Sequence, residues 1–461
     1  MIASGMPQAG PPRSVSLPHS HEIRLASGLR VIAFSRGELR ESLHIPLISS
    51  VLIGNRGAAK DPVGLPGVAA MTSTLMRQGT TRHTALELDL AIDAIGARLD
   101  RSAGYDAISA GAGSTTAVFP QAFALMTETV REPTFLREEF ERARTRSLSD
   151  LRLAYSSPSS LARLVAGRLI GGDSPYGHPV AGTPRSLEAL GRDDVAAFHQ
   201  HAFRPEHGTL LLGGDISVDD AFALAEKLFG DWRTDPHPLS DPVALPQPAA
   251  KRRVIAIDKP DAGRTAVIVT RPALPRNHPA YYAGAVSSAM FSGYSGRLNQ
   301  EVRVKRGLSY GAGASLIWRR DSGQFVASTL VDHKRTVEAV RVVLDTIESL
   351  ASRPPDEREL TTRKASMLGG WNRSIETSEG LIGALAEFAL YGIPLDELER
   401  YSESILAIDG ENVRQFAEAH IIPDPTIILV GDTGNYASEL GTFADDVRII
   451  PAADLDLEAL Q

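Results

Sequence analysis

Apolar residues recur with two different periods along this chain, and each period predicts a different kind of element. The runs RVIAF at 30–34 and RVIAI at 253–257 are typical of buried strands. In contrast, VFPQAFALMTETV at 118–130 and TVEAVRVVLDTIESL at 336–350 carry apolar residues at helical spacing. Strand-like and helical segments follow one another in each half of the chain. This mixture predicts an α+β fold in which helices pack on a mostly antiparallel sheet.

The order of these segments repeats within the chain. Residues 187–215, LEALGRDDVAAFHQHAFRPEHGTLLLGGD, resemble residues 405–432, ILAIDGENVRQFAEAHIIPDPTIILVGD. A second pair of similar segments, 108–147 and 325–366, lies at about the same spacing and in the same order. Self-similarity at one long period indicates a duplicated structural unit.

The repeat divides the chain into two homologous domains joined by a linker. Residues 235–252 separate the repeats and contain five prolines, which deny this stretch regular hydrogen bonding and stiffen it. We therefore expect a flexible lead-in over 1–19, a first α+β domain over 20–234, this linker, and a second α+β domain over 253–461. The two domains together would form half of a clamshell.

Composition and charge exclude several classes of function. The chain has 461 residues, a formal net charge of −8 and no cysteine. The negative charge argues against nucleic acid or an anionic membrane as a partner. The absence of cysteine excludes disulfides, Cys-ligated zinc and a thiol nucleophile. The sequence has no run of about 18 apolar residues, so it predicts no membrane span.

One segment carries a specific resemblance. Residues 297–310, RLNQEVRVKRGLSY, resemble the R-L-x-x-x-[LV]-R-x-x-x-G-L-x-Y signature in the second domain of pitrilysin/insulinase-type zinc peptidases. The preceding FSGYSG at 291–296 and the segment SPYGHPVAGTPRSLEAL at 174–190 fit the same family. The similarity is nearest to the half-length bacterial and mitochondrial-processing-peptidase branch.

The resemblance also locates the helix that binds zinc in active members of the family. In these proteins an H-x-x-E-H motif and a distal Glu provide the metal ligands and the general base. In this chain the corresponding segment is GVAAMTSTLMRQGT at 67–80, where Ala70 and Thr74 occupy the two His positions and Ser73 the Glu position. Ala has no donor atom, and neutral hydroxyl groups are poor zinc ligands beside imidazole. Glu141 is a candidate for the distal position, but a single carboxylate cannot retain zinc. We therefore expect no catalytic residue and no metal in this chain.

A second functional element of the family is intact. The resemblance implies that Arg303 and Tyr310 bind the substrate backbone and help to polarise the scissile carbonyl. A forked cation and a phenol donor both suit a peptide oxygen that gains charge. In half-length relatives one subunit supplies zinc and its partner supplies this pair. The alternative interpretation is a surface arginine and a half-buried strand tyrosine.

The remaining histidines do not predict a metal site. His19 ends the expected lead-in, and we assign His21 to the same loose stretch. His199 and His201 lie on alternate positions of a predicted helix and point in different directions, and His207 follows in a loop. We interpret them as surface or capping residues.

The resemblance therefore implies a non-catalytic subunit of a heterodimeric zinc peptidase. Its expected partners are a zinc-bearing homologous subunit and a peptide substrate, with a homodimer possible when the chain is alone. The alternatives are a structural protein or a peptide-binding protein of the same fold, and independent proteolysis with replacement ligands is the least favoured. We expect a protein that is cytoplasmic at face value, or periplasmic if an export signal has been trimmed.

Overall fold

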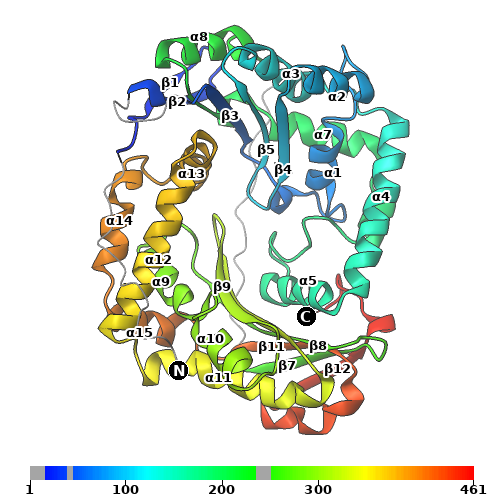
Figure 1. Ribbon diagram of the computed structural model, residues 1–461. Helices are drawn as coiled ribbons and strands as arrows, with labels where there is room; N and C mark the ends of the chain where they lie inside the picture. Colours follow the sequence, from blue (N-terminus) through cyan, green and yellow to red (C-terminus); the bar gives the residue numbers. More distant parts are fainter. Residues whose placement is uncertain (1–15, 39–44, 235–250, 461) are drawn as a thin grey trace.

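The chain folds into two domains, each built on a six-stranded mixed sheet with packed helices (Figure 1). The structure is a computed structural model that describes residues 16–38, 45–234 and 251–460. Most of the expected linker and lead-in therefore lies outside the described residues. The elements of the first half are β1 (His21–Arg24), β2 (Arg30–Ser35), β3 (Leu47–Gly54), α1 (Val68–Leu75), α2 (Ala85–Ala94), β4 (Arg98–Ala103), β5 (Ile108–Thr115), α3 (Phe119–Arg131), α4 (Arg137–Ser156), α5 (Pro158–Gly171), α6 (Pro184–Ala189), α7 (Arg192–Ala202), β6 (Thr209–Gly214) and α8 (Val218–Phe229).

The second half has a closely related series of elements. They are β7 (Arg253–Asp258), β8 (Thr265–Ala273), α9 (Tyr281–Phe291), α10 (Arg297–Asn299), β9 (Ala312–Trp318), β10 (Gly323–Val331), α11 (Thr336–Ser352), α12 (Glu357–Ile375), α13 (Ser378–Tyr391), α14 (Glu397–Ala407), α15 (Gly410–His420), β11 (Thr426–Gly431) and β12 (Asp446–Pro451). No helix among the described residues is both long enough and apolar enough to cross a lipid bilayer.

The two sheets share one strand order, as the internal repeat predicts. The first runs β1-β2-β6-β3-β5-β4 and the second β12-β7-β11-β8-β10-β9. In the first sheet β2 pairs in parallel with β6, and in the second β7 pairs in parallel with β11. The three following pairings of each sheet are antiparallel. The repeated helices α7 and α15 bury equivalent residues, Val195 and Phe198 in one and Val413 and Phe416 in the other. The α+β prediction is confirmed.

The edge strands show where the two halves differ. His21 opens β1 and pairs with Ala33 of β2, so it belongs to the first sheet. Assigning His21 to a loose lead-in is therefore wrong, because backbone pairing with β2 fixes the position of this strand. In the second sheet the equivalent edge is β12, which runs parallel to β7.

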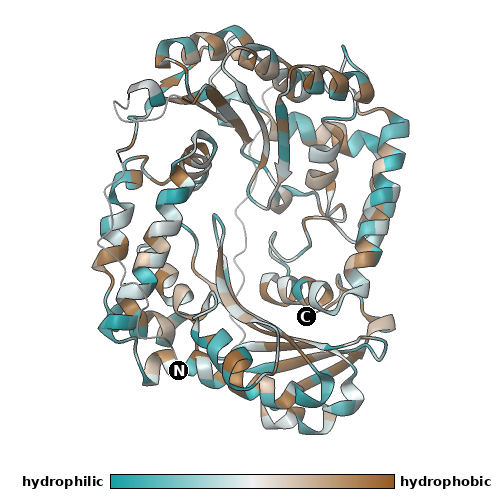
Figure 2. Ribbon diagram, in the orientation of Figure 1, coloured by the Kyte–Doolittle hydropathy of each residue, from teal (hydrophilic) through white to brown (hydrophobic). Residues whose placement is uncertain are grey.

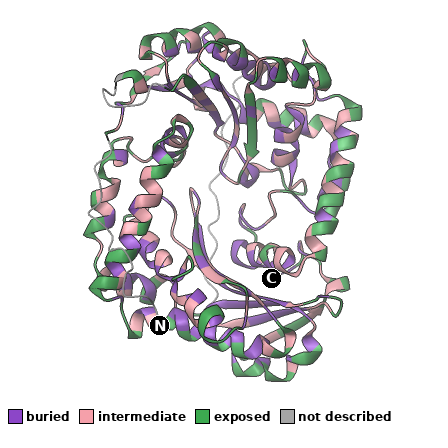
Figure 3. Ribbon diagram, viewed as in Figure 1, coloured by how far each residue is buried: buried purple, intermediate pink, exposed green. Residues whose placement is uncertain are grey.

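Each sheet is covered on one face by a helix from the other half of the chain. The α5 helix packs on β8 and β11 of the second sheet, and α13 packs on β3 and β6 of the first. Leu161, Val165 and Leu169 of α5 are buried with Ile255 and Ile428 of the second sheet. Figure 3 shows that the central strands of both sheets are largely buried, and Figure 2 shows that those of the second sheet are largely hydrophobic.

Local sequence explains why these two covering helices begin where they do. The Ser157 hydroxyl caps α5 by accepting a hydrogen bond from the Ser160 N–H, and Pro158 occupies the first helical position. Thr377 caps α13 in the same way through the Gly380 N–H. Gly392 ends α13 in the left-handed conformation, with φ of 67°, which favours glycine. Both helices therefore have encoded ends, and their buried faces bind the domains together.

Candidate functional site

The α1 helix, where zinc would bind in active relatives, is fixed firmly in the first domain. Gly67 precedes it with φ of 101°, a left-handed conformation that suits glycine. The Asp61 carboxylate accepts hydrogen bonds from the N–H groups of Gly67 at 2.6 Å and Ala69 at 3.1 Å. These bonds satisfy donors at the start of the helix. Burial raises the pKa of Asp61 to about 8 in spite of them.

The side chains on α1 do not form a zinc site. Ala70 and Thr74 lie half-buried one turn apart, and Ser73 is buried with no hydrogen-bond partner for its hydroxyl among the described residues. The Glu141 carboxylate on α4 forms an ion pair with Arg144. In the described part of the chain, no three His, Cys, Asp or Glu side chains come together as a possible metal site. The residues present therefore do not fit the metal, and no chemistry can be assigned to it in this chain.

The signature segment at 297–310 is anchored by buried apolar residues and by the mostly buried Arg297, and it exposes Arg303 and Tyr310. Leu298, Val302 and Leu308 are buried in the core of the second domain. Arg297 is held by two hydrogen bonds to the Glu359 carboxylate, at 2.8 and 2.6 Å. Such a bidentate pair fixes orientation as well as position.

The helix changes geometry at Arg303. Residues Gln300–Lys305 form a π-helical turn, and Gly307 closes it at φ of 60° with its N–H bonded to the Arg303 carbonyl. Single π-helical turns often mark functional sites. Lys305 and Arg306 on the same turn both pair with Glu301, which accounts for them as surface residues.

Arg303 and Tyr310 are both exposed, and each stacks on a different residue. The Arg303 guanidinium lies 5.3 Å from the ring centre of Tyr294, which is itself 70 % exposed. Tyr310 is 79 % exposed and its ring lies 4.8 Å from the Arg264 guanidinium. Neither the Arg303 guanidinium nor the Tyr310 hydroxyl forms a hydrogen bond with another described residue. The expectation of a half-buried strand tyrosine is wrong, because Tyr310 precedes β9 and points to solvent.

The structure shows what one of the histidines contacts. His199 lies in the last turn of α7 with its ring 5.3 Å from Phe135 and 5.4 Å from Phe203. Its Nε2 lies 2.8 Å from the Val130 carbonyl oxygen. Burial lowers the pKa of His199 to about 4. His199 is half-buried rather than a surface residue, and its bond to a carbonyl in the last turn of α3 makes it a capping residue, in agreement with one of the two expectations.

A polar cluster between the domains was not predicted from the sequence. It consists of Asp106, Tyr176, Arg320 and Tyr391. The buried Asp106 carboxylate accepts hydrogen bonds from the Tyr176 hydroxyl at 2.8 Å, the Arg320 N–H at 3.0 Å and the Tyr391 hydroxyl at 3.3 Å. Burial, together with the negative charge of Asp106, raises the pKa of Tyr176 and Tyr391 above that of an ordinary tyrosine. The Asp106 carboxylate of the first domain thereby joins Tyr176 of its own domain to Arg320 and Tyr391 of the second.

The fold and these sites define a class: a two-domain metallopeptidase fold in which the helix at the metal position carries no His, Cys, Asp or Glu. Residues 48–165 match the family model described as insulinase (peptidase family M16), and residues 189–367 match the one described as peptidase M16 inactive domain. The chain belongs to peptidase family M16.

Several relatives support this assignment. A protein from Mycobacterium leprae named as an uncharacterized zinc protease is 25% identical over 374 residues, covering 80% of this chain and 82% of that one. The mitochondrial-processing peptidase subunit alpha of Neurospora crassa is 23% identical over 172 residues, covering 37% of this chain and 30% of that one. A solved structure of a peptidase M16 inactive domain from Pseudomonas fluorescens has a TM-score of 0.82 at 23% identity and covers 89% of this chain and 98% of that chain. A protease from Helicobacter pylori has a TM-score of 0.81 at 18% identity, with 90% and 100% covered. The solved structures support the fold. The match to the inactive-domain model and the similarity to a processing-peptidase alpha subunit, together with an α1 helix that has no His, Cys, Asp or Glu, support a non-catalytic member of the family.

Proposed function

We propose that this chain is the non-catalytic subunit of a heterodimeric zinc peptidase. It would form half of a peptide chamber and contact the substrate through Arg303 and Tyr310, while a homologous partner subunit holds the zinc ion. One contrast carries the proposal: α1 offers no set of metal ligands, whereas the signature segment exposes Arg303 on its helical turn and Tyr310 just before β9.

The chemistry of the pair suits a peptide. The guanidinium offers several N–H donors in a fixed plane and the phenol offers one O–H donor. Both can bind carbonyl oxygens of an extended chain and can strengthen their hydrogen bonds as negative charge develops on one of them. The stacking on Tyr294 and Arg264 uses the flat faces of these groups and leaves the hydrogen-bonding atoms available.

The experiment is reconstitution of a peptidase. The chain is mixed with a zinc-bearing family member from the same cell, and cleavage of a fluorogenic peptide library is measured for each chain alone and for the mixture. We expect activity only in the mixture. Arg303→Ala or Tyr310→Phe should lower kcat of the mixture by about 100-fold, the usual cost of losing one donor to a developing oxyanion.

The matched control is Lys305→Ala, because Lys305 is exposed on the same turn and pairs with Glu301. It should leave turnover unchanged. Wild-type turnover in both the Arg303 and Tyr310 variants would refute the assigned role. Peptide binding by the isolated chain, without activity in any mixture, would instead support the alternative of a peptide-binding protein.

A further inference from the structure

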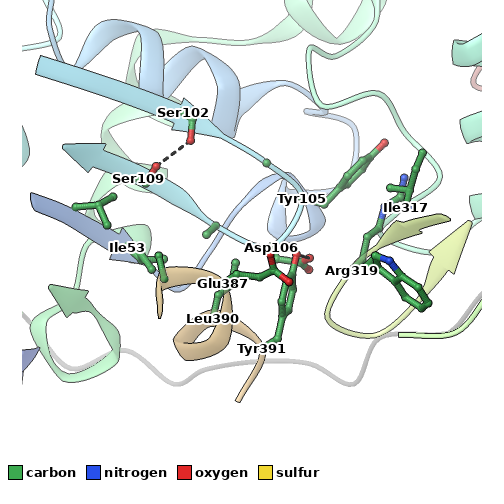
Figure 4. A pocket seen from close by; sticks show the side chains of 15 residues that line it. Ile53, Ser102, Tyr105, Asp106, Ser109, Ile317, Arg319, Glu387, Leu390 and Tyr391 are labelled. Carbon is green, nitrogen blue, oxygen red and sulfur yellow. Dashed lines mark hydrogen bonds between the residues drawn. The ribbon is translucent and has the colours of Figure 1, made fainter. Parts of the chain in front are cut away.

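A cavity of about 690 Å³ lies between the two domains. It is lined by the β4–β5 hairpin of the first sheet, the β9–β10 hairpin of the second and helix α13, and it is open to solvent (Figure 4). Its walls are largely apolar and include Val51, Ile53, Ile317, Trp318, Ala386 and Leu390. Its volume is within the range of small-molecule sites, which runs from about 300 to 1,000 Å³.

One charged side chain in this cavity has no matching partner. Arg319 is only 8 % exposed, and its guanidinium lies 4.2 Å from the ring centre of Tyr105 and 5.2 Å from that of Tyr176. Its Nε has no hydrogen-bond acceptor among the described residues. No described carboxylate forms an ion pair with it. Stacking satisfies the faces of the guanidinium, but its N–H donors lie around the edge.

The carboxylates that line the same cavity are already engaged. Asp106 accepts three hydrogen bonds from the interdomain cluster, and Glu387 is paired with Arg276 at 2.5 Å. Neither carboxylate forms a direct ion pair or hydrogen bond with Arg319. A buried donor without an acceptor costs free energy, and a buried cation costs more, so the site favours an acceptor that enters from outside.

We propose that this cavity binds a carboxylate with an apolar body, with the carboxylate accepting hydrogen bonds from Arg319. A planar guanidinium matches a carboxylate better than any other common anion except phosphate. The apolar walls disfavour phosphate, which keeps its charged oxygens on all sides. Two sources carry the required chemistry: the C-terminal residue of a peptide with an apolar side chain, and a medium-chain fatty acid. The proposal does not rest on proteolysis, because it concerns the isolated chain.

The test is calorimetric titration of the purified full chain with two matched pairs of ligands. The first pair is acetyl-Leu-Leu with a free carboxylate and the same dipeptide as its amide. The second pair is decanoate and decanol. Since Trp318 lines the cavity, quenching of its fluorescence gives an independent signal that Trp318→Phe should remove. We expect the acid of at least one pair to bind and its uncharged counterpart to bind roughly 10- to 100-fold more weakly, as expected for hydrogen bonds to a charged group.

Variants locate the site. Arg319→Gln should weaken the acid to the level of its uncharged counterpart, and Ala386→Phe should reduce binding of both by filling the cavity. Arg264→Gln is the matched control, because Arg264 also stacks on a tyrosine but lies outside the cavity. If the Arg319→Gln protein does not fold, the same titrations are made with Arg319→Lys, which keeps the positive charge. Equal binding of acid and uncharged ligand, binding unaffected by Arg319→Gln, or binding by neither pair would each overturn the proposal, and the pair that binds identifies the source.

Discussion

Substitution of Phe388 by Ala should destabilise the first domain, although Phe388 belongs to the second half of the chain. Phe388 on α13 is 1 % exposed and shares a buried cluster with Ile32, Phe34 and Leu211 of the first sheet. A buried Phe→Ala change usually costs about 3–5 kcal/mol through lost contacts and the cavity that remains. A cost of about 3 kcal/mol should speed exchange of amides that open by global unfolding by on the order of 100-fold.

The assay combines urea unfolding with hydrogen exchange measured peptide by peptide. In Phe388→Ala we expect a lower unfolding midpoint and faster exchange in β3 and β6 as well as in the second sheet. Leu406→Ala is the control, because Leu406 is 49 % exposed and should change neither signal. If β3 and β6 kept wild-type protection while only the second sheet lost it, the two halves would not depend on each other and the reasoning would fail.

Two further predictions concern buried polar groups. The pKa of His199 is lowered to about 4 in the folded chain against about 6.5 when unfolded, so its contribution to stability is complete above pH 6.5 and is lost as pH falls toward 4. Between pH 7 and pH 4.5 the free energy of unfolding should fall by about 2 kcal/mol less in His199→Gln than in the wild type, because glutamine does not titrate and can still donate to the Val130 carbonyl. The same fall in both proteins would contradict this. Asp106→Asn should cost about 1–3 kcal/mol in urea unfolding, because an amide cannot accept three hydrogen bonds as the carboxylate does. Wild-type stability in this variant would show that the interdomain cluster contributes nothing.

The helices, the strands and the internal repeat could be predicted from the sequence, because they follow from the pattern of apolar residues within continuous segments. Buried strands such as RVIAI and the amphipathic helix at 336–350 bury their apolar residues in the structure as their spacing predicts. The duplication implies that the two sheets share one strand order, but not which order it is. The family resemblance placed Ala70 and Thr74 at the His positions and Ser73 at the Glu position, and the chemistry of their side chains then argued against zinc binding.

The remaining features depend on contacts between distant segments. The pattern in α13 predicts an apolar face, but it does not say that this face packs on the other domain's sheet. Asp106 lies in the β4–β5 turn and Arg319 in the β9–β10 turn, and nothing in the local sequence distinguishes them from other charged turn residues. Only the packing of the two domains places both at one cavity. The run RRD at 319–321 was a sequence signal for the interdomain cluster, because three charged residues directly after a strand can form ion pairs or hydrogen bonds with another segment.

The exchange of helices between the two halves has a consequence for biosynthesis. When β6 has left the ribosome, the first sheet is complete in its strands, but the face that contains Ile32 and Leu211 has no cover until residues 378–391 have been translated. An uncovered apolar face on a nascent chain invites aggregation. Chaperone demand during translation, and failure of the first half to remain in solution when expressed without the second, are both expected from this order of synthesis.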